Sequence, residues 1–150
     1  ILGESDEFVA RKVKAVLEND MIPILCVGET EEERKEGQTE ERIGSEIRTA
    51  LFALSKEETA KMVIAYEPIW AIGSGQAATP KDAEEIASFI RKTVKEAAGK
   101  KAADEVRILY GGSVNGDNIC HFLKQKNIDG ALIGGASLKP DTMIDIYNKA

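Results

Sequence analysis

Residues 62–75 read Met62-Val63-Ile64-Ala65-Tyr66-Glu67-Pro68-Ile69-Trp70-Ala71-Ile72-Gly73-Ser74-Gly75, and this stretch decides how the chain folds. Its first five residues predict a buried strand that ends at Tyr66. Glu67 follows directly, and an apolar run with two glycines comes after Pro68. Surface loops seldom carry Ile, Trp and Ile unless these side chains cover something. The order predicts a general base with a mobile lid behind it, although a strand ending in a solvated Glu67 is the open alternative for that residue.

Helices and strands alternate on both sides of this segment. Apolar runs predict strands over 22–27, 62–66, 106–110 and 130–133, and apolar residues at helical spacing predict helices over 6–18, 39–54, 80–98, 115–125 and after Pro140. Such alternation is typical of an α/β fold with a parallel sheet covered by helices. The loops after parallel strands meet at one edge of the sheet, so the segments at 28–29, 67–75, 111–113 and 134–137 should converge.

Glycine pairs follow the last two predicted strands. Gly111-Gly112-Ser113 and Gly134-Gly135-Ala136-Ser137 each lead from a strand toward a helix. Glycine lets backbone N–H groups approach a ligand closely, and helix N-termini attract anions. The two loops therefore predict a phosphate site. Together with Glu67 and the lid, they predict proton abstraction next to a carbonyl in a small phosphorylated substrate.

Composition excludes several other classes of function. A net charge of −6 and a pI near 5.0 argue against a nucleic-acid partner. No apolar run approaches the roughly 20 residues that a membrane span needs. Cys26 and Cys120 lie far apart and belong to no metal-binding pattern, so we expect reduced thiols, a cytoplasmic location, and neither metal nor cofactor.

Several motifs resemble the triosephosphate isomerase family. They are the stretch 66–75, Tyr110-Gly111-Gly112-Ser113-Val114, Gly130-Ala131-Leu132-Ile133-Gly134-Gly135-Ala136-Ser137-Leu138, Cys26-Val27-Gly28-Glu29 and Leu2-Gly3-Glu4-Ser5-Asp6. The resemblance covers essentially all 150 residues. It implies one domain over 1–150 that forms the C-terminal half, strands 5–8 with flanking helices, of a TIM (β/α)8 barrel.

The resemblance also implies a reaction without a cofactor. Glu67 would move a proton between two substrate carbons through an enediolate, interconverting dihydroxyacetone phosphate and D-glyceraldehyde 3-phosphate in glycolysis and gluconeogenesis. The backbone N–H groups that would hold the phosphate of this small triose are those of Gly73, Ser113, Gly134 and Gly135.

Further residues would form the lid and its contacts. The resemblance implies an N-terminal hinge at Pro68-Ile69-Trp70, a lid containing Ala71, Ile72, Ser74 and Gly75, and a C-terminal hinge at Gln76-Ala77-Ala78. Tyr110 would latch the closed lid through the Ala78 amide, Ser113 would bond the lid near Gly75, and Glu29 would contact Trp70 in the open state. Gln76 and Ser74 stand where many relatives have Lys and Thr, which should affect lid kinetics more than chemistry.

Parts of the family pattern are missing from this chain. Its Asn-x-Lys strand and its Gly-His-Ser-Glu-Arg-Arg strand are not present, and His121, the one histidine, is expected to be an ordinary helix residue. We therefore expect negligible activity from the isolated chain. The homodimer contacts of the family come largely from the missing half, and we expect this chain to self-associate through open sheet edges at 22–27 and 130–133. Another phosphate-sugar isomerase or epimerase, and a phosphate-binding or self-associating half-domain without catalysis, stay open as alternatives.

Overall fold

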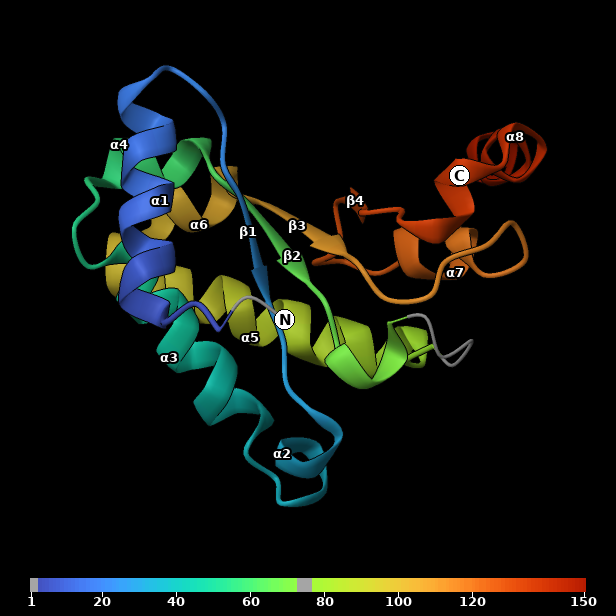
Figure 1. Ribbon diagram of the computed structural model, residues 1–150, viewed down its shortest axis with the longest axis horizontal. Helices are drawn as coiled ribbons and strands as arrows, with labels where there is room; N and C mark the ends of the chain where they lie inside the picture. Colours follow the sequence, from blue (N-terminus) through green and yellow to red (C-terminus); the bar gives the residue numbers. More distant parts are fainter. Residues whose placement is uncertain (1–2, 73–76) are drawn as a thin grey trace.

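The computed structural model describes residues 3–72 and 77–150, and its centre is a four-stranded parallel sheet. The strands are β1 (Ile24–Val27), β2 (Val63–Tyr66), β3 (Arg107–Tyr110) and β4 (Gly130–Ala131), and they are neighbours in chain order. Figure 1 shows helices gathered along one side of this sheet, with the C-terminal helix set beyond its far end. The α/β architecture with a parallel sheet is confirmed.

The strands are in a register that separates two faces of the sheet. Val27, Tyr66 and Tyr110 form one row across three strands, and Leu25, Ile64 and Ile108 form another. These six residues are all buried. Side chains alternate along a strand, so the intervening residues face the other way, and there Ile24 is 49% exposed.

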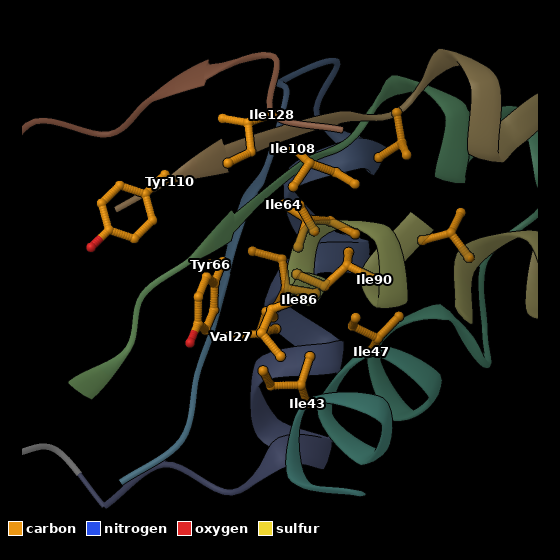
Figure 2. Close-up of a cluster of buried hydrophobic side chains, with 14 of the residues drawn as sticks. Val27, Ile43, Ile47, Ile64, Tyr66, Ile86, Ile90, Ile108, Tyr110 and Ile128 are labelled. Atoms are coloured by element: carbon orange, nitrogen blue, oxygen red, sulfur yellow. The ribbon is translucent and has the colours of Figure 1, made fainter. Parts of the chain in front are cut away.

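The helix-facing side of the sheet carries the hydrophobic core. Three long helices contribute to it, α1 (Asp6–Glu18), α3 (Thr39–Leu51) and α5 (Pro80–Ala98). Figure 2 shows Ile43 and Ile47 of α3 and Ile86 and Ile90 of α5 gathered around Ile64. The predicted apolar faces of α3 and α5 are confirmed, whereas α1 buries only Val13 fully and leaves Phe8 43% exposed.

Short capping sequences begin helices that the hydrophobic pattern does not predict. Thr30 and Glu33 form a reciprocal capping box at α2 (Glu31–Lys35), and Ser55 and Glu58 form another at α4 (Lys56–Lys61). A third short helix, α6 (Lys100–Glu105), follows Gly99, whose φ of 91° ends α5. The predicted start of α5 is confirmed, because the Thr79 side chain accepts a hydrogen bond from the Asp82 N–H.

The C-terminal third differs most from its prediction. The expected helix over 115–125 is only α7 (Ile119–Leu123), since Asn115 Oδ1 accepts hydrogen bonds from the Asp117 and Asn118 N–H groups and forms a turn first. The expected strand over 130–133 is only β4. A 3₁₀ turn, η2 (Gly135–Leu138), then leads into α8 (Pro140–Lys149).

Arg91 links α5 to the end of α6 and to the residue before β4. Its guanidinium donates to the Ala103 carbonyl at 2.6 Å and the Val106 carbonyl at 3.1 Å, and to Asp129 Oδ2 at 2.8 Å. Asp129 Oδ2 also accepts from the Ile108 N–H at 2.8 Å. Only 20% of the Arg91 side chain is exposed, whereas 37% of the Asp129 side chain is, so the two part-buried carbonyls depend most on this donor.

The substitution Arg91→Met should lower the free energy of unfolding by about 2–3 kcal/mol, because partly buried acceptors lose their donor. Urea unfolding followed by circular dichroism measures this change. Lys35→Met is the matched control, since the Lys35–Glu31 pair is largely exposed on both sides and should contribute less than about 0.5 kcal/mol. Equal midpoints for the two variants would show that Arg91 is dispensable.

Candidate active site

The candidate site lies where three strands end. The sheet hydrogen bonds continue one residue past each strand, from the Glu67 N–H to the Val27 carbonyl at 2.8 Å, and from the Gly111 N–H to the Tyr66 carbonyl at 2.8 Å. The Leu132 N–H bonds the Tyr110 carbonyl at 2.9 Å in the same way. These bonds fix the start of each loop, so the loops leave the sheet at neighbouring positions.

A hollow of about 410 Å³ opens between these loops. It brings together Glu67, Ser113, Gly134 and Gly135, four of the predicted site residues, and the lid residue Ile72. Its remaining lining is Gly111, Gly112, Val114, Leu132, Ile133 and Ala136. Within the described residues, the N–H groups of Ser113, Gly134 and Gly135 donate no hydrogen bond, and all three residues line the hollow together with Glu67.

Two glycines make room for Glu67. A Cβ on Gly111 would lie 2.5 Å from Glu67 Cγ and 2.9 Å from Glu67 Oε1. A Cβ on Gly28 would collide with the Glu67 carbonyl group. Gly28 follows β1 and Gly111 follows β3, so backbone from both neighbouring strands touches this residue. Glu67 is thereby held on two sides by surfaces that only glycine can provide.

Cys26 is a neighbour of Glu67 that sequence reasoning treated as an ordinary strand residue. It pairs with Ala65 in the sheet, and alternation puts Ala65 and Glu67 on the same side of β2. Partial burial of the thiol and, second, the adjacent Glu67 carboxylate together raise the pKa of Cys26 to about 11. The Cys26 thiol is therefore a neutral neighbour of the carboxylate. The pairing of Cys26 with Ala65 in the parallel sheet is the feature that could have indicated this proximity to Glu67 from the sequence.

The segment after Glu67 is anchored to the Gly28-Glu29 turn. It forms a 3₁₀ turn, η1 (Ile69–Ala71), in which the Ile69 N–H donates to the Glu29 carbonyl at 3.0 Å. The Trp70 Nε1–H donates to Glu29 Oε1 at 2.8 Å, the contact that the resemblance implies for an open lid. Ala71 is buried, whereas Ile69 and Ile72 are each 52% exposed. Of this apolar run, only the central part around Ala71 packs against the rest of the protein.

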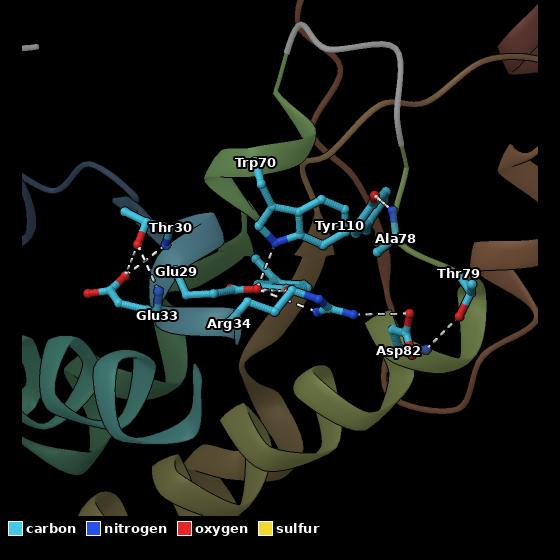
Figure 3. A network of polar contacts seen from close by, with 10 residues as sticks. Glu29, Thr30, Glu33, Arg34, Trp70, Ala78, Thr79, Asp82 and Tyr110 are labelled. Atoms are coloured by element: carbon cyan, nitrogen blue, oxygen red, sulfur yellow. Dashed lines mark hydrogen bonds and ion pairs between the residues drawn. The ribbon is translucent and has the colours of Figure 1, made fainter. Parts of the chain in front are cut away.

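Glu29 is the buried centre of a polar network, shown in Figure 3. It is 0% exposed, and Oε1 also accepts from the Tyr66 hydroxyl at 3.2 Å. Arg34 lies 3.6 Å from the same oxygen, stacks 4.7 Å above the Trp70 ring, and pairs with Asp82 at 3.3 Å. Within the described residues, Glu29 Oε2 has no partner. The part played by Arg34 was not predicted, because the sequence between Glu29 and Thr39 was interpreted as a charged loop, whereas the structure has α2 there. Asp82 was predicted only as an acidic residue in the first turn of α5, without its ion pair to Arg34.

Tyr110 reaches the far end of the lid segment. Its hydroxyl accepts a hydrogen bond from the Ala78 N–H at 3.0 Å, and its ring stacks on Phe122 with centroids 4.1 Å apart. Burial raises the pKa of Tyr110, which keeps the hydroxyl neutral. The role of this contact as a latch stays a prediction. Four residues with predicted lid or phosphate roles, Gly73, Ser74, Gly75 and Gln76, lie outside the described residues.

No grouping of three or more His, Cys, Asp or Glu side chains that could hold a metal ion occurs within residues 3–72 and 77–150. In the same ranges, no helix is long and apolar enough to cross a membrane. The described residues that line the hollow carry one carboxylate, that of Glu67, one hydroxyl, that of Ser113, and backbone N–H groups.

Trp70 is the one tryptophan of the chain, so its fluorescence reports on Glu29 directly. In Glu29→Leu the indole N–H loses its acceptor, and we expect its emission to move to longer wavelength as the hinge loosens. The free energy of unfolding should fall by about 1–3 kcal/mol. Glu29→Gln is the matched control, because its amide oxygen can keep the Trp70 and Tyr66 bonds. Identical spectra for the two variants would mean that Glu29 does not hold the hinge.

Comparison with known proteins agrees with this geometry. A family model described as triosephosphate isomerase matches residues 1–150. The triosephosphate isomerase of Roseiflexus sp. (strain RS-1) is 50% identical over 148 residues, covering 99% of this chain and 58% of that protein. That of Dictyoglomus turgidum is 50% identical over 144 residues, covering 96% and 58%. The chain thus spans a little over half the length of these relatives, and it belongs to the triosephosphate isomerase family.

Proposed function

We propose that this chain supplies the proton-transfer and phosphate-binding side of an enzyme that interconverts dihydroxyacetone phosphate and D-glyceraldehyde 3-phosphate. One observation carries the proposal. The Glu67 carboxylate rests against Gly111 at the wall of a hollow that Ser113, Gly134 and Gly135 also line, and the N–H groups of these three residues bond no described residue. A base and a set of backbone N–H groups suited to an anion therefore line one hollow, as a small phosphorylated substrate requires.

Each group has a distinct part in the proposed reaction. The N–H groups of Ser113, Gly134 and Gly135 bind the phosphate and so place the adjacent carbons over Glu67. Glu67 takes a proton from one carbon, and the resulting enediolate regains it at the neighbouring carbon. Closure of the lid, with Gly73 as a further phosphate donor and Ser74 and Gly75 within the lid, excludes water from this intermediate. Tyr110 through Ala78, and Glu29 through Trp70, hold its two ends.

The chain supplies only part of such a site. Among the described residues that line the hollow, none is Lys, Arg or His. Nothing in that lining stabilises the negative charge that develops on the substrate oxygen, a contribution worth about 10²–10³-fold in rate. We therefore propose that residues 1–150 are one half of a (β/α)8 barrel, active when the other half is present. The free cysteines support a cytoplasmic location.

A chimera tests this function. It joins the present chain to the part of the Roseiflexus relative that the chain does not match. We expect isomerase turnover from the chimera, and a fall in kcat of about 10²–10⁴-fold in its Glu67→Gln variant, because the base is lost while the shape is kept.

Glu57→Gln, on an exposed residue of α4, should leave the turnover of the chimera unchanged. The isolated chain, assayed in parallel, should show negligible turnover. If it nevertheless binds a phosphorylated enediolate mimic tightly, the second candidate function, phosphate binding without catalysis, describes the chain by itself. A Glu67→Gln chimera that keeps turnover within tenfold of its parent would remove Glu67 from the mechanism.

We further propose that the isolated chain self-associates through β1. This strand is an edge of the sheet, and a second copy is the partner that matches it best, because an identical edge offers the same unpaired backbone groups. Ile22 is 58% exposed and Ile24 is 49% exposed along this edge. The opposite edge, β4, has only two residues, which makes it a weaker template than the sequence predicts.

Light scattering should give a mass well above the 16.3 kDa of one chain. Ile24→Lys should restore the monomer, because charge on an edge strand opposes pairing. Phe52→Lys is the control, since Phe52 is 93% exposed at the end of α3 and away from the sheet edge. A parent chain that is monomeric at all salt concentrations would contradict this proposal.

A further inference from the structure

Glu46 of α3 lies beneath the Gly28-Glu29 turn and has no role in the function proposed above. Its Oε2 accepts a hydrogen bond from the Gly28 N–H at 3.1 Å. Its Oε1 pairs with Arg42 Nη2 at 2.7 Å, one helical turn earlier. The side chain is only 15% exposed. Helix α3 is thereby hydrogen-bonded to the backbone just after β1.

The backbone that Glu46 holds touches both working parts of the site. The α-carbon of Gly28 abuts the Glu67 carbonyl with no space for a Cβ, so a shift of Gly28 moves the backbone of the base. The next residue, Glu29, accepts from the Ile69 N–H and from the Trp70 indole. A movement of the Gly28-Glu29 turn would therefore displace both Glu67 and the predicted N-terminal hinge at Trp70.

We propose that Glu46 is a positioning residue for Glu67 and the Trp70 hinge, and that its protonation loosens the turn it holds. When ionised, the carboxylate binds the Gly28 N–H through a charge-assisted hydrogen bond; when neutral, it is a weaker acceptor. The catalytic part of this inference rests on the proposed function, whereas the contact between Glu46 and Gly28 does not.

The surrounding charges favour protonation at Glu46 rather than at its neighbours. One guanidinium, Arg42, serves three carboxylates: Glu46, Asp6 of α1 at 3.3 Å, and Glu33 of α2 at 4.0 Å. Glu46 is the least exposed of the three, at 15% against 26% for Asp6 and 29% for Glu33. An excess of negative charge around one cation is relieved by protonating the carboxylate with least access to water.

The balance of these effects places the transition near neutral pH. The pKa of Glu46 is raised to about 7 in total: burial is the main cause of the rise and the Asp6 carboxylate adds to it, while Arg42 and the Gly28 N–H oppose it. Since the folded pKa exceeds the usual 4.5, the group stabilises the fold below pH 4.5 and loses that contribution as pH rises through 7. Protonation of Glu46 thus increases the stability of the fold and at the same time weakens its hydrogen bond with the Gly28 N–H.

The experiment follows the Gly28 backbone amide by NMR between pH 5 and 9 in the present chain, with Ile24→Lys as the background if association broadens the spectra. We expect its chemical shift to titrate with a midpoint near pH 7, and Trp70 emission to follow the same curve. Glu46→Gln should abolish both titrations, because its amide oxygen accepts at every pH. Glu41→Gln, on an exposed residue of the same helix, should change neither.

Asp6→Asn gives a second test that keeps Glu46 intact. It removes a carboxylate that raises the pKa of Glu46 and leaves more of Arg42 for it, so the Gly28 midpoint should move to lower pH. In the chimera, Glu46→Gln should remove an ionisation near pH 7 from the kcat/KM profile.

A Gly28 shift that stays flat in the parent, or that titrates equally in Glu46→Gln, would overturn the inference. An inactive chimera with a normal Gly28 titration would instead count against the proposed function alone.

Discussion

The structure depends on the close approach of three backbone segments at the ends of β1, β2 and β3. Gly28 and Gly111 lie against Glu67 from opposite sides, and neither position has room for a Cβ. This contact requires parallel strands in one register, because only then do three strands end at the same level. The buried rows of Leu25, Ile64 and Ile108 maintain that register from the core side. Packing in the core thus determines where the carboxylate lies.

Charge is distributed unevenly between the hollow and its support. The described lining offers one carboxylate, one hydroxyl and backbone N–H groups, whereas Glu29 and Glu46, which form ion pairs with Arg34 and Arg42, are not part of that lining. Glu29 is fully buried, and a carboxylate without full hydrogen bonding is costly in such surroundings. That cost is offset by bonds to Trp70, Tyr66 and Arg34, which belong to three different segments. Glu29 therefore links three segments of the chain: the turn that contains Trp70, the end of β2 at Tyr66, and α2 at Arg34.

The sequence predicts the long elements and the loops that meet, and it fails where local polar bonds compete with hydrophobic pattern. The strand at Tyr66, the apolar faces of α3 and α5, and the Thr79 cap follow from periodicity and capping rules. The capping boxes at Thr30 and Ser55 were visible as S/T-x-x-E motifs, yet α2 and α4 are too short for an apolar stripe. Asn115 shortens α7 through side-chain bonds that no periodicity records. Cys26 and Glu46 became visible only when register and helix packing placed them beside Gly28 and Glu67.

The two ends of the predicted lid segment are held in chemically different ways. At the N-terminal end, Trp70 and Ile69 bond to a carboxylate and a carbonyl of one residue, Glu29, whose neighbour Gly28 is held by Glu46. At the C-terminal end, the Ala78 N–H meets a neutral phenol fixed by stacking on Phe122. The first contact is strengthened by charge and responds to nearby titration, whereas the second does not. In the proposed scheme, a proton bound at Glu46 of α3 therefore affects the predicted N-terminal hinge and leaves the predicted C-terminal hinge unchanged.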